Sequence, residues 1–189
     1  MYFFIVFSCM LCIIVVNSLF IDYLAPLSVL DIICACTLAV IAQIILDLIL
    51  ALIVRRCLPK KLFLPVKKFF SATKKETAFY EKIKIKSWKE KVLELGALTG
   101  FRKNKIASPK DQEYISRYIF EANCGVLVHI VCIIFGFLIT FMYPLKYFVN
   151  FCLPVSIVNA ALNLLPLMTL RYNLVKLNKI FLINKRRES

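Results

Sequence analysis

Four long apolar runs limit most strongly what this chain can fold into. They cover residues 1–20, 24–54, 124–145 and 147–170, and among them only the second contains Asp, Glu, Lys or Arg, namely Asp31 and Asp47. A transmembrane helix needs roughly 20 apolar residues. Hydrophobic residues make up 61% of the chain, against about 45–50% in soluble domains. The sequence therefore predicts an all-α membrane protein with four transmembrane helices in two hairpins.

The positive charges indicate how such a protein would be oriented. Of the 25 Lys and Arg residues, eighteen lie between Arg55 and Glu121, and six more follow the fourth run. Basic loops stay on the cytoplasmic side, so we expect a multi-pass cell-membrane protein with both termini cytoplasmic. The net charge of +14 then favours anionic lipid headgroups as partners. No nucleic-acid-binding motif is present, and no nucleic-acid partner is expected.

The predicted organisation has four parts. Residues 1–54 form an N-terminal transmembrane hairpin, 55–122 a basic interfacial cytoplasmic loop, 123–173 a C-terminal hairpin with the active-site candidates, and 174–189 a basic cytoplasmic tail. The first run could instead be a signal peptide, but it lacks a positively charged start and a small-residue cleavage site. We therefore favour a retained span.

The loop is expected to be structured. Residues 58–70 and 76–95 interleave lysines with bulky apolar side chains, among them Trp88. This pattern predicts an amphipathic helix over 76–95 that lies among the lipid headgroups, with a solvated charged loop as the alternative. Gly96 and Gly100 indicate a turn. Pro109 predicts the start of a helix that runs through Glu121 into the third apolar run.

The single histidine, His129, lies inside the third apolar run. An ionisable residue there is costly and is a functional candidate by default, and imidazole suits proton transfer near neutral pH. From the helical rise, we expect Asp47, His129 and Asn163 at roughly 8–10 Å from the cytoplasmic edge. Such residues should face one another in a single layer. Asp47 and Asn163 could alternatively serve only as ties between helices.

Cysteine is abundant but carries no clear metal signal. Seven of the eight cysteines lie in apolar runs, where cysteine behaves as a small hydrophobe. Cys9 and Cys12 form a CxxC pair with no second pair and no histidine in the same segment. We therefore expect no metal site.

Three segments follow, in order, the pattern of one enzyme family: FYEKIKIKSWKEKVLELGALTGFRK (79–103), EANCGVLVH (121–129) and NLLPLMTLRYN (163–173). The chain resembles the glycosyl-4,4'-diaponeurosporenoate acyltransferases, small membrane enzymes of staphyloxanthin-type carotenoid biosynthesis. The matching positions are Trp88, Lys89, Gly96, Phe101, Lys103, Glu121, His129, Asn163, Pro166, Arg171, Tyr172 and Asn173. The departures are Leu170 and Leu174, where the family has Gln and Arg, and Cys124 and Val126, where it tends to have charged residues.

The resemblance implies transfer of a fatty acyl group to a hydroxyl of a glycolipid or isoprenoid-glycoside acceptor. It implies no bound cofactor; acyl-CoA or another acyl donor would be the co-substrate. His129 would be the general base, with Glu121 or Asp47 as its carboxylate partner.

The remaining candidates would bind substrate. Arg171 would hold an anionic donor or stabilise an oxyanion. The acceptor would be bound by Asn163, Tyr172 and Asn173, and the donor phosphates or lipid headgroups by Trp88, Lys89 and Lys103. Two alternatives stay open: a non-catalytic lipid-binding or helper membrane protein, favoured by the departures at 170 and 174, and a small transporter, for which the polar groups are too confined to one side. The sequence does not define the oligomeric state.

Overall fold

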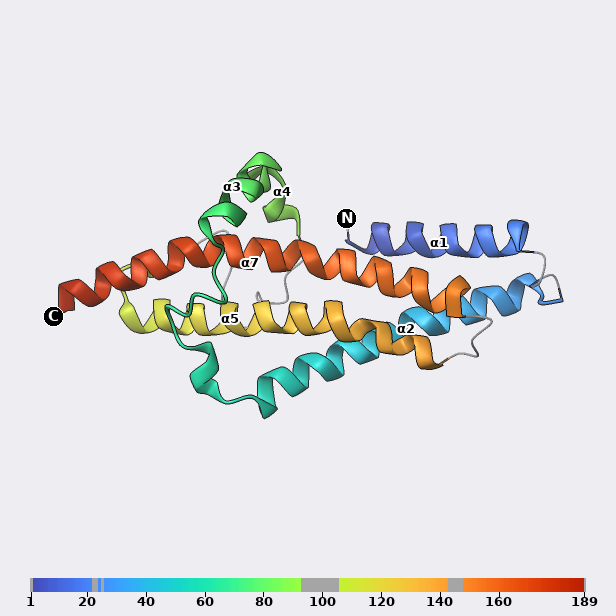
Figure 1. Ribbon diagram of the computed structural model, residues 1–189, viewed down its shortest axis with the longest axis horizontal. Coiled ribbons are helices and arrows are strands. Elements are labelled where there is room, and N and C mark those ends of the chain that lie inside the picture. The colour runs from blue at the N-terminus through green and yellow to red at the C-terminus, as the bar shows by residue number, and fades with distance from the viewer. Residues whose placement is uncertain (1, 22–23, 25, 93–105, 143–147, 189) are drawn as a thin grey trace. The chain divides into compact units, whose positions relative to one another are not determined.

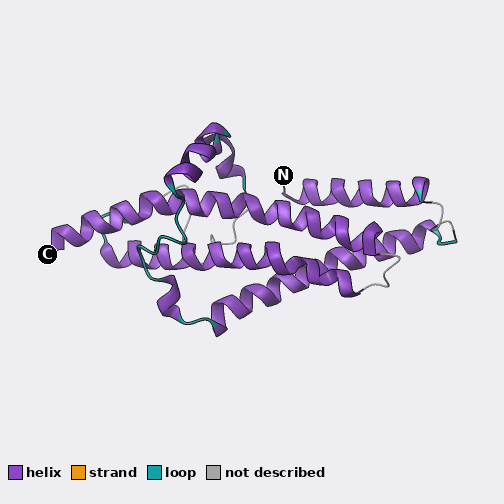
Figure 2. Ribbon diagram, in the orientation of Figure 1, coloured by secondary structure: helices purple, strands orange, loops and turns teal. Residues whose placement is uncertain are grey.

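The computed structural model describes residues 2–21, 24, 26–92, 106–142 and 148–188, and these are helical with connecting loops and turns (Figures 1 and 2). The elements in chain order are α1 Tyr2–Phe20, α2 Val29–Cys57, η2 Lys60–Phe63, α3 Lys74–Lys82, α4 Ile85–Trp88, η3 Lys89–Lys91, α5 Gln112–Phe135, the 3-10 helix η5 Gly136–Met142, the π-helix η6 Phe148–Cys152 and α7 Leu153–Glu188. No strand occurs among these residues, which confirms the predicted all-α class.

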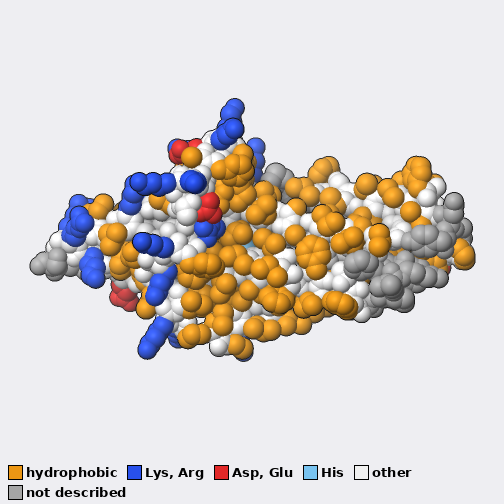
Figure 3. Space-filling view, viewed as in Figure 1, with side chains coloured by type: hydrophobic (Ala, Val, Ile, Leu, Met, Phe, Trp, Pro, Cys, Tyr) orange, Lys and Arg blue, Asp and Glu red, His pale blue; other side chains and the backbone are white. Residues whose placement is uncertain are grey.

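Three helices of the described part are long and apolar enough to cross a membrane. They span Val29–Cys57, Gln112–Phe141 and Val149–Arg187, while the apolar helix Phe4–Phe20 is shorter. Figure 3 shows hydrophobic side chains over the visible face of α1 and α2, and Lys and Arg side chains gathered over α3. The length and apolar character of these helices indicate a membrane protein.

The helices begin where short polar side chains cap them. Ser28 and Asp31 cap α2 reciprocally, since the Ser28 N–H donates to Asp31 Oδ2 at 3.0 Å and the Asp31 N–H donates to Ser28 Oγ at 3.2 Å. Asp111 caps α5 by accepting the Tyr114 N–H at 3.0 Å. These bonds satisfy backbone donors that lack a partner within the helix. The helix predicted from Pro109 through Glu121 is thereby confirmed.

The contacts divide the chain into two units. The first comprises Met1–Leu52 and Val131–Asn163, and the second comprises Ile53–Ile130 and Leu164–Ser189. Each unit therefore combines segments from both halves of the sequence, and α2, α5 and α7 contribute to both.

The first unit has an apolar core next to a buried pair of asparagines. Leu24, Ile32, Cys36 and Phe151 form a buried cluster against which α1 packs. Within this unit Asn17 Nδ2 donates to the Asn150 carbonyl at 3.1 Å, and Asn150 Nδ2 donates to Asn17 Oδ1 at 2.9 Å. Both asparagines are buried, at 4% and 9% exposure. This reciprocal pair joins α1 to η6.

The second unit holds the basic loop against α7. Tyr80, Ile85 and Met168 form its buried cluster, with Trp88 and Tyr172 packed on it. The prediction of one amphipathic helix over 76–95 is wrong, because α3 ends at Lys82 and the chain turns at Lys84, whose φ of 53° is left-handed. The turn brings Ile85, which is fully buried, into the cluster. Gly96 and Gly100 lie outside the described residues.

The last helix is also longer than predicted. The helix α7 continues from Leu153 to Glu188 rather than ending near Leu170. Beyond that point Leu174 and Leu177 are buried, and buried Asn184 donates to the Pro109 carbonyl at 2.9 Å. Burial of this face of α7 in the second unit explains why residues 174–188 are helical.

We predict that Asn17→Ala lowers the stability of the protein by about 1–2 kcal/mol, because it removes the two buried hydrogen bonds between Asn17 and Asn150. Thermal unfolding in detergent measures this. Val16→Ala, at an exposed neighbouring position, is the control and should change the midpoint little. Equal midpoints for the two variants would contradict a stabilising role for the pair.

Candidate active site

A carboxylate surrounded by carboxamides lies in the first unit. Asp47 Oδ1 accepts from Gln43 Nε2 at 3.0 Å and from Asn159 Nδ2 at 3.2 Å. Asp47 Oδ2 accepts from Asn163 Nδ2 at 3.2 Å. Asp47 is partly exposed, whereas Gln43, Asn159 and Asn163 are buried. A carboxylate on an apolar helix needs such donors, because its apolar surroundings provide none.

The structure thus brings together Asp47 and Asn163, which are 116 residues apart. Sequence reasoning missed Gln43 and Asn159, although a signal was present. Each lies four residues before a predicted site residue, and residues four apart share one face of a helix. A polar residue one turn away from Asp47 or Asn163 was therefore a candidate for the same cluster.

The other two proposed members of the catalytic group lie in the second unit. His129 is a partly exposed residue of α5. Glu121, on the same helix, accepts from Arg55 at 3.0 Å in an ion pair. This pair joins Arg55 in the last turn of α2 to Glu121 of α5. The catalytic roles of His129, Glu121 and Asp47 stay predictions.

Several of the predicted binding residues meet in a basic cluster of the second unit. Lys89 Nζ donates to Asn173 Oδ1 at 2.9 Å and lies 5.4 Å from the centroid of the Tyr172 ring. The Tyr172 ring also contacts Tyr80 edge-to-face. Trp88 Nε1 donates to the Ile83 carbonyl at 3.0 Å. The hydrogen bond from Lys89 to Asn173 thereby joins the loop to α7 across 84 positions of the sequence.

Arg171 fastens the loop before α3 to α7. Its Nη1 donates to the Phe69 carbonyl at 2.6 Å, and its Nη2 donates to the Ser71 carbonyl at 3.3 Å. The same Nη2 lies 2.9 and 3.0 Å from the two Glu76 carboxylate oxygens. We call this arrangement of Arg171, Glu76 and the two carbonyls the clasp. It uses the guanidinium as a structural donor, so binding of an anionic substrate by Arg171 stays a prediction.

Glu76 also belongs to the cap of α3. The Thr73 hydroxyl accepts the Glu76 N–H, and the Glu76 carboxylate accepts the Thr73 N–H at 2.7 Å. Partial burial opposes ionisation of Glu76, but the hydrogen bonds from Thr73 and the Arg171 guanidinium outweigh it, and the Glu76 pKa is lowered from 4.5. The clasp and the cap therefore both favour the charged carboxylate.

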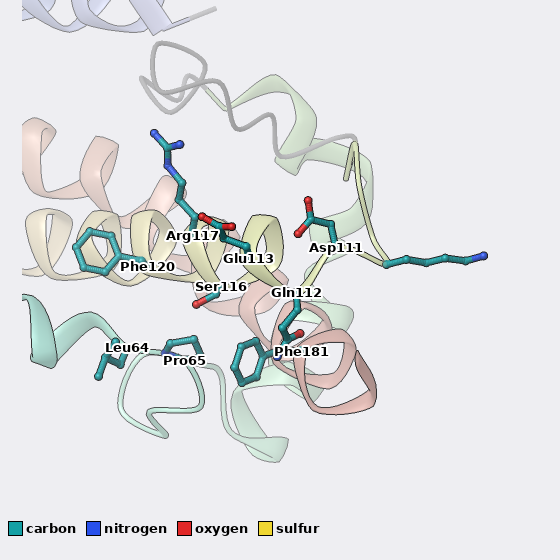
Figure 4. A pocket seen from close by; sticks show the side chains of 10 residues that line it. Leu64, Pro65, Asp111, Gln112, Glu113, Ser116, Arg117, Phe120 and Phe181 are labelled. Carbon is teal, nitrogen blue, oxygen red and sulfur yellow. The ribbon is translucent and has the colours of Figure 1, made fainter. Parts of the chain in front are cut away.

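The second unit also has an open groove of about 890 Å³. Figure 4 shows Leu64 and Pro65 on one side of it and Ser116 and Phe120 of α5 on the other. Charged residues of both signs line it, and none of the predicted site residues does. Lys103 lies outside the described residues. Within the described part, no group of three or more His, Cys, Asp and Glu side chains is arranged to hold a metal ion.

The model of the family described as CrtO, glycosyl-4,4'-diaponeurosporenoate acyltransferase, matches residues 59–182. This is most of the chain, so the protein belongs to this acyltransferase family of carotenoid biosynthesis, as the resemblance predicted. No curated protein and no solved structure matches the chain.

We predict that Glu76→Gln lowers the unfolding midpoint at neutral pH, because it weakens both the clasp and the cap. The folded-state pKa of Glu76 lies below its ordinary value of 4.5. Its contribution is therefore fully present above pH 4.5 and is lost as the pH falls through the folded-state pKa. The difference between wild type and Glu76→Gln should shrink over that acidic range.

Glu81→Gln is the matched control, since the Glu81 carboxylate forms, among the described residues, an exposed pair with Lys86 at 3.8 Å and a long contact with Tyr172. Exposed pairs contribute little. A pH-independent difference between wild type and Glu76→Gln would contradict the assignment.

Proposed function

We propose that the protein is a membrane-embedded acyltransferase that transfers a fatty acyl group to a hydroxyl of a glycolipid or isoprenoid-glycoside acceptor. Its membership of the acyltransferase family, over residues 59–182, is the observation that carries this proposal. The matched region includes His129, the basic cluster around Lys89, and Asn163. Membrane lipids would surround the site and supply both acyl-chain and acceptor substrates.

In the proposed reaction His129 accepts the proton of the acceptor hydroxyl. The hydroxyl oxygen attacks the carbonyl carbon of an acyl thioester such as acyl-CoA. A carbon–oxygen bond forms, the carbon–sulfur bond breaks, and His129 returns the proton to the leaving thiolate. Glu121 or Asp47 is the carboxylate proposed to orient His129 or to balance the imidazolium charge. No bound cofactor is required.

Donor recognition is proposed for the basic cluster. Lys89 carries the charge, and its neighbours Trp88, Tyr172 and Asn173 provide aromatic surface and polar groups. Phosphates of acyl-CoA would be attracted to such a group, and Lys103 would add a further charge. For Arg171 we propose a structural role in the clasp, since its guanidinium already donates to Glu76 and to two backbone carbonyls.

We further propose a cell-membrane protein with four spans in two hairpins and both termini cytoplasmic. The three long apolar helices would be joined by α1 as the first span. Two observations support this: α1 packs in the same apolar core as α2, and the basic residues concentrate between Arg55 and Glu121 and after the fourth run. The second candidate function, a non-catalytic helper protein, is supported by Leu170 and Leu174, which replace the family's Gln and Arg.

We predict that His129→Ala slows formation of the acylated product by about 10²–10⁴-fold, because the general base is lost. The measurement is lipid profiling of host membranes that carry wild type, His129→Ala or neither, at matched protein levels. A lipid that requires wild type and vanishes with the variant would identify the transferred group by its mass. Full turnover by His129→Ala would exclude the general-base role, and three identical profiles would favour the helper protein.

We predict that Lys89→Gln raises the KM for acyl-CoA about tenfold with little change in kcat, because one charge-assisted contact to the donor is lost. Initial rates at varied donor concentration test this. Lys91→Gln, at an exposed position two residues away, should leave the KM unchanged. An equal effect of the two substitutions would show that general surface charge, rather than the basic cluster, attracts the donor.

A further inference from the structure

The loop formed by residues 60–69, in the second unit, exposes several large apolar side chains. Leu62, Leu64 and Phe69 are 39%, 49% and 61% exposed. The exposed Phe69 ring rests edge-on against the buried ring of Phe70, with centroids 5.1 Å apart. Large apolar side chains exposed close together mark a surface that meets another protein or a membrane.

The backbone of this loop is fixed from inside the second unit. Asn123 Nδ2 donates to the Phe63 and Leu64 carbonyls at 2.9 and 3.2 Å, and Arg171 Nη1 donates to the Phe69 carbonyl at 2.6 Å. Asn123 directly precedes the third apolar run of the sequence, and Arg171 directly follows the fourth. The loop is therefore bound where two apolar runs end, and its exposed side chains are held in place there.

Basic residues surround the exposed apolar side chains. From Arg55 to Lys75 the sequence contains eight Lys and Arg residues and no Asp or Glu. Four of these lie in the loop and are exposed: Lys60, Lys61, Lys67 and Lys68. Lysine stems cover apolar surface while their ammonium groups reach polar surroundings. A group of roughly four to eight basic residues next to the end of an apolar helix is typical of surfaces that bind anionic lipid headgroups.

We propose that the 60–69 loop docks into the headgroup layer of a bilayer and binds anionic phospholipids there. Leu62, Leu64 and Phe69 enter the boundary between headgroups and acyl chains, and the four loop lysines bind lipid phosphates. A soluble acidic partner would match the charge equally well, but it would not explain an exposed aromatic ring held at the end of an apolar run. The inference goes beyond the proposed reaction and does not depend on acyl transfer.

The test measures how closely lipid approaches position 69. The full chain with Phe69→Trp is placed in nanodiscs of phosphatidylcholine and phosphatidylglycerol, in which one of the two lipids carries brominated acyl chains that quench tryptophan fluorescence on contact. Ile183→Trp is the matched control, because Ile183 is also exposed, at 50%, but lies on α7 roughly 18 Å beyond Arg171. Wild type gives the background signal of Trp88.

We expect strong quenching of Phe69→Trp and little quenching of Ile183→Trp by either lipid. At equal content, brominated phosphatidylglycerol should quench Phe69→Trp more than brominated phosphatidylcholine does. Adding Lys61→Gln, Lys67→Gln and Lys68→Gln should reduce this preference about fivefold, because a lysine near an anionic surface contributes roughly that factor. Quenching by phosphatidylcholine should remain.

A charge-matched control removes three exposed basic residues from α7 in the Phe69→Trp chain, by Lys179→Gln, Lys185→Gln and Arg187→Gln. It should keep the preference for phosphatidylglycerol. The unfolding midpoint in phosphatidylcholine alone checks that each variant is folded, and Lys68→Gln by itself repeats the measurement if the triple substitution lowers that midpoint.

Three results would overturn the proposal. Quenching of Phe69→Trp no greater than that of Ile183→Trp would place the loop in water and favour a soluble acidic partner. Equal quenching by the two brominated lipids would exclude selection of anionic lipid. An equal loss of preference in the two charge variants would assign the selection to net charge rather than to the loop. None of these readouts uses acyl transfer, so the loop and the acyltransferase function are tested separately.

Discussion

A polar side chain on a long apolar helix must find its hydrogen-bond partners within the protein, and this constraint organises the first unit. Asp47 would be expensive to bury alone, and three carboxamides donate to it. Asn17 and Asn150 satisfy each other in the same way. Because apolar packing has no direction, these polar contacts are what fix how the helices of this unit are rotated about their own axes.

The second unit is organised by a charged contact of a different kind. The clasp binds backbone carbonyls of the loop before α3 as well as the Glu76 carboxylate, so a single guanidinium fixes the course of several residues. Val66 and Lys84 have positive φ angles of 64° and 53°, which β-branched and long side chains adopt only at a cost. The Val66 N–H donates to Asn178 on α7 at 3.1 Å, and the burial of Ile85 follows directly on the turn at Lys84. The loop is therefore shaped by its contacts with α7.

The two polar clusters, one in each unit, differ in their chemistry. Carboxylate and carboxamide groups among apolar helices offer acceptors to neutral hydroxyls, whereas lysine beside aromatic rings attracts anionic groups. Both clusters include residues of the region that matches the family, 59–182: Asn163 belongs to the first cluster, and Lys89, Tyr172 and Asn173 belong to the second.

The sequence by itself determined the all-α class, the apolar runs, the start of α5 and the family, because these depend on composition, local capping and short motifs. It also placed Asp47 and Asn163 at similar depth, from which their meeting could be anticipated. It did not determine the break at Lys84 or the extension of α7 to Glu188, because both follow from burial of Ile85 and Leu174 against distant residues. Nor did it assign Gln43 and Asn159 to the Asp47 cluster or Glu76 to Arg171. Only the tertiary structure decided these, since a side chain's partner depends on how helices far apart in sequence are rotated and packed.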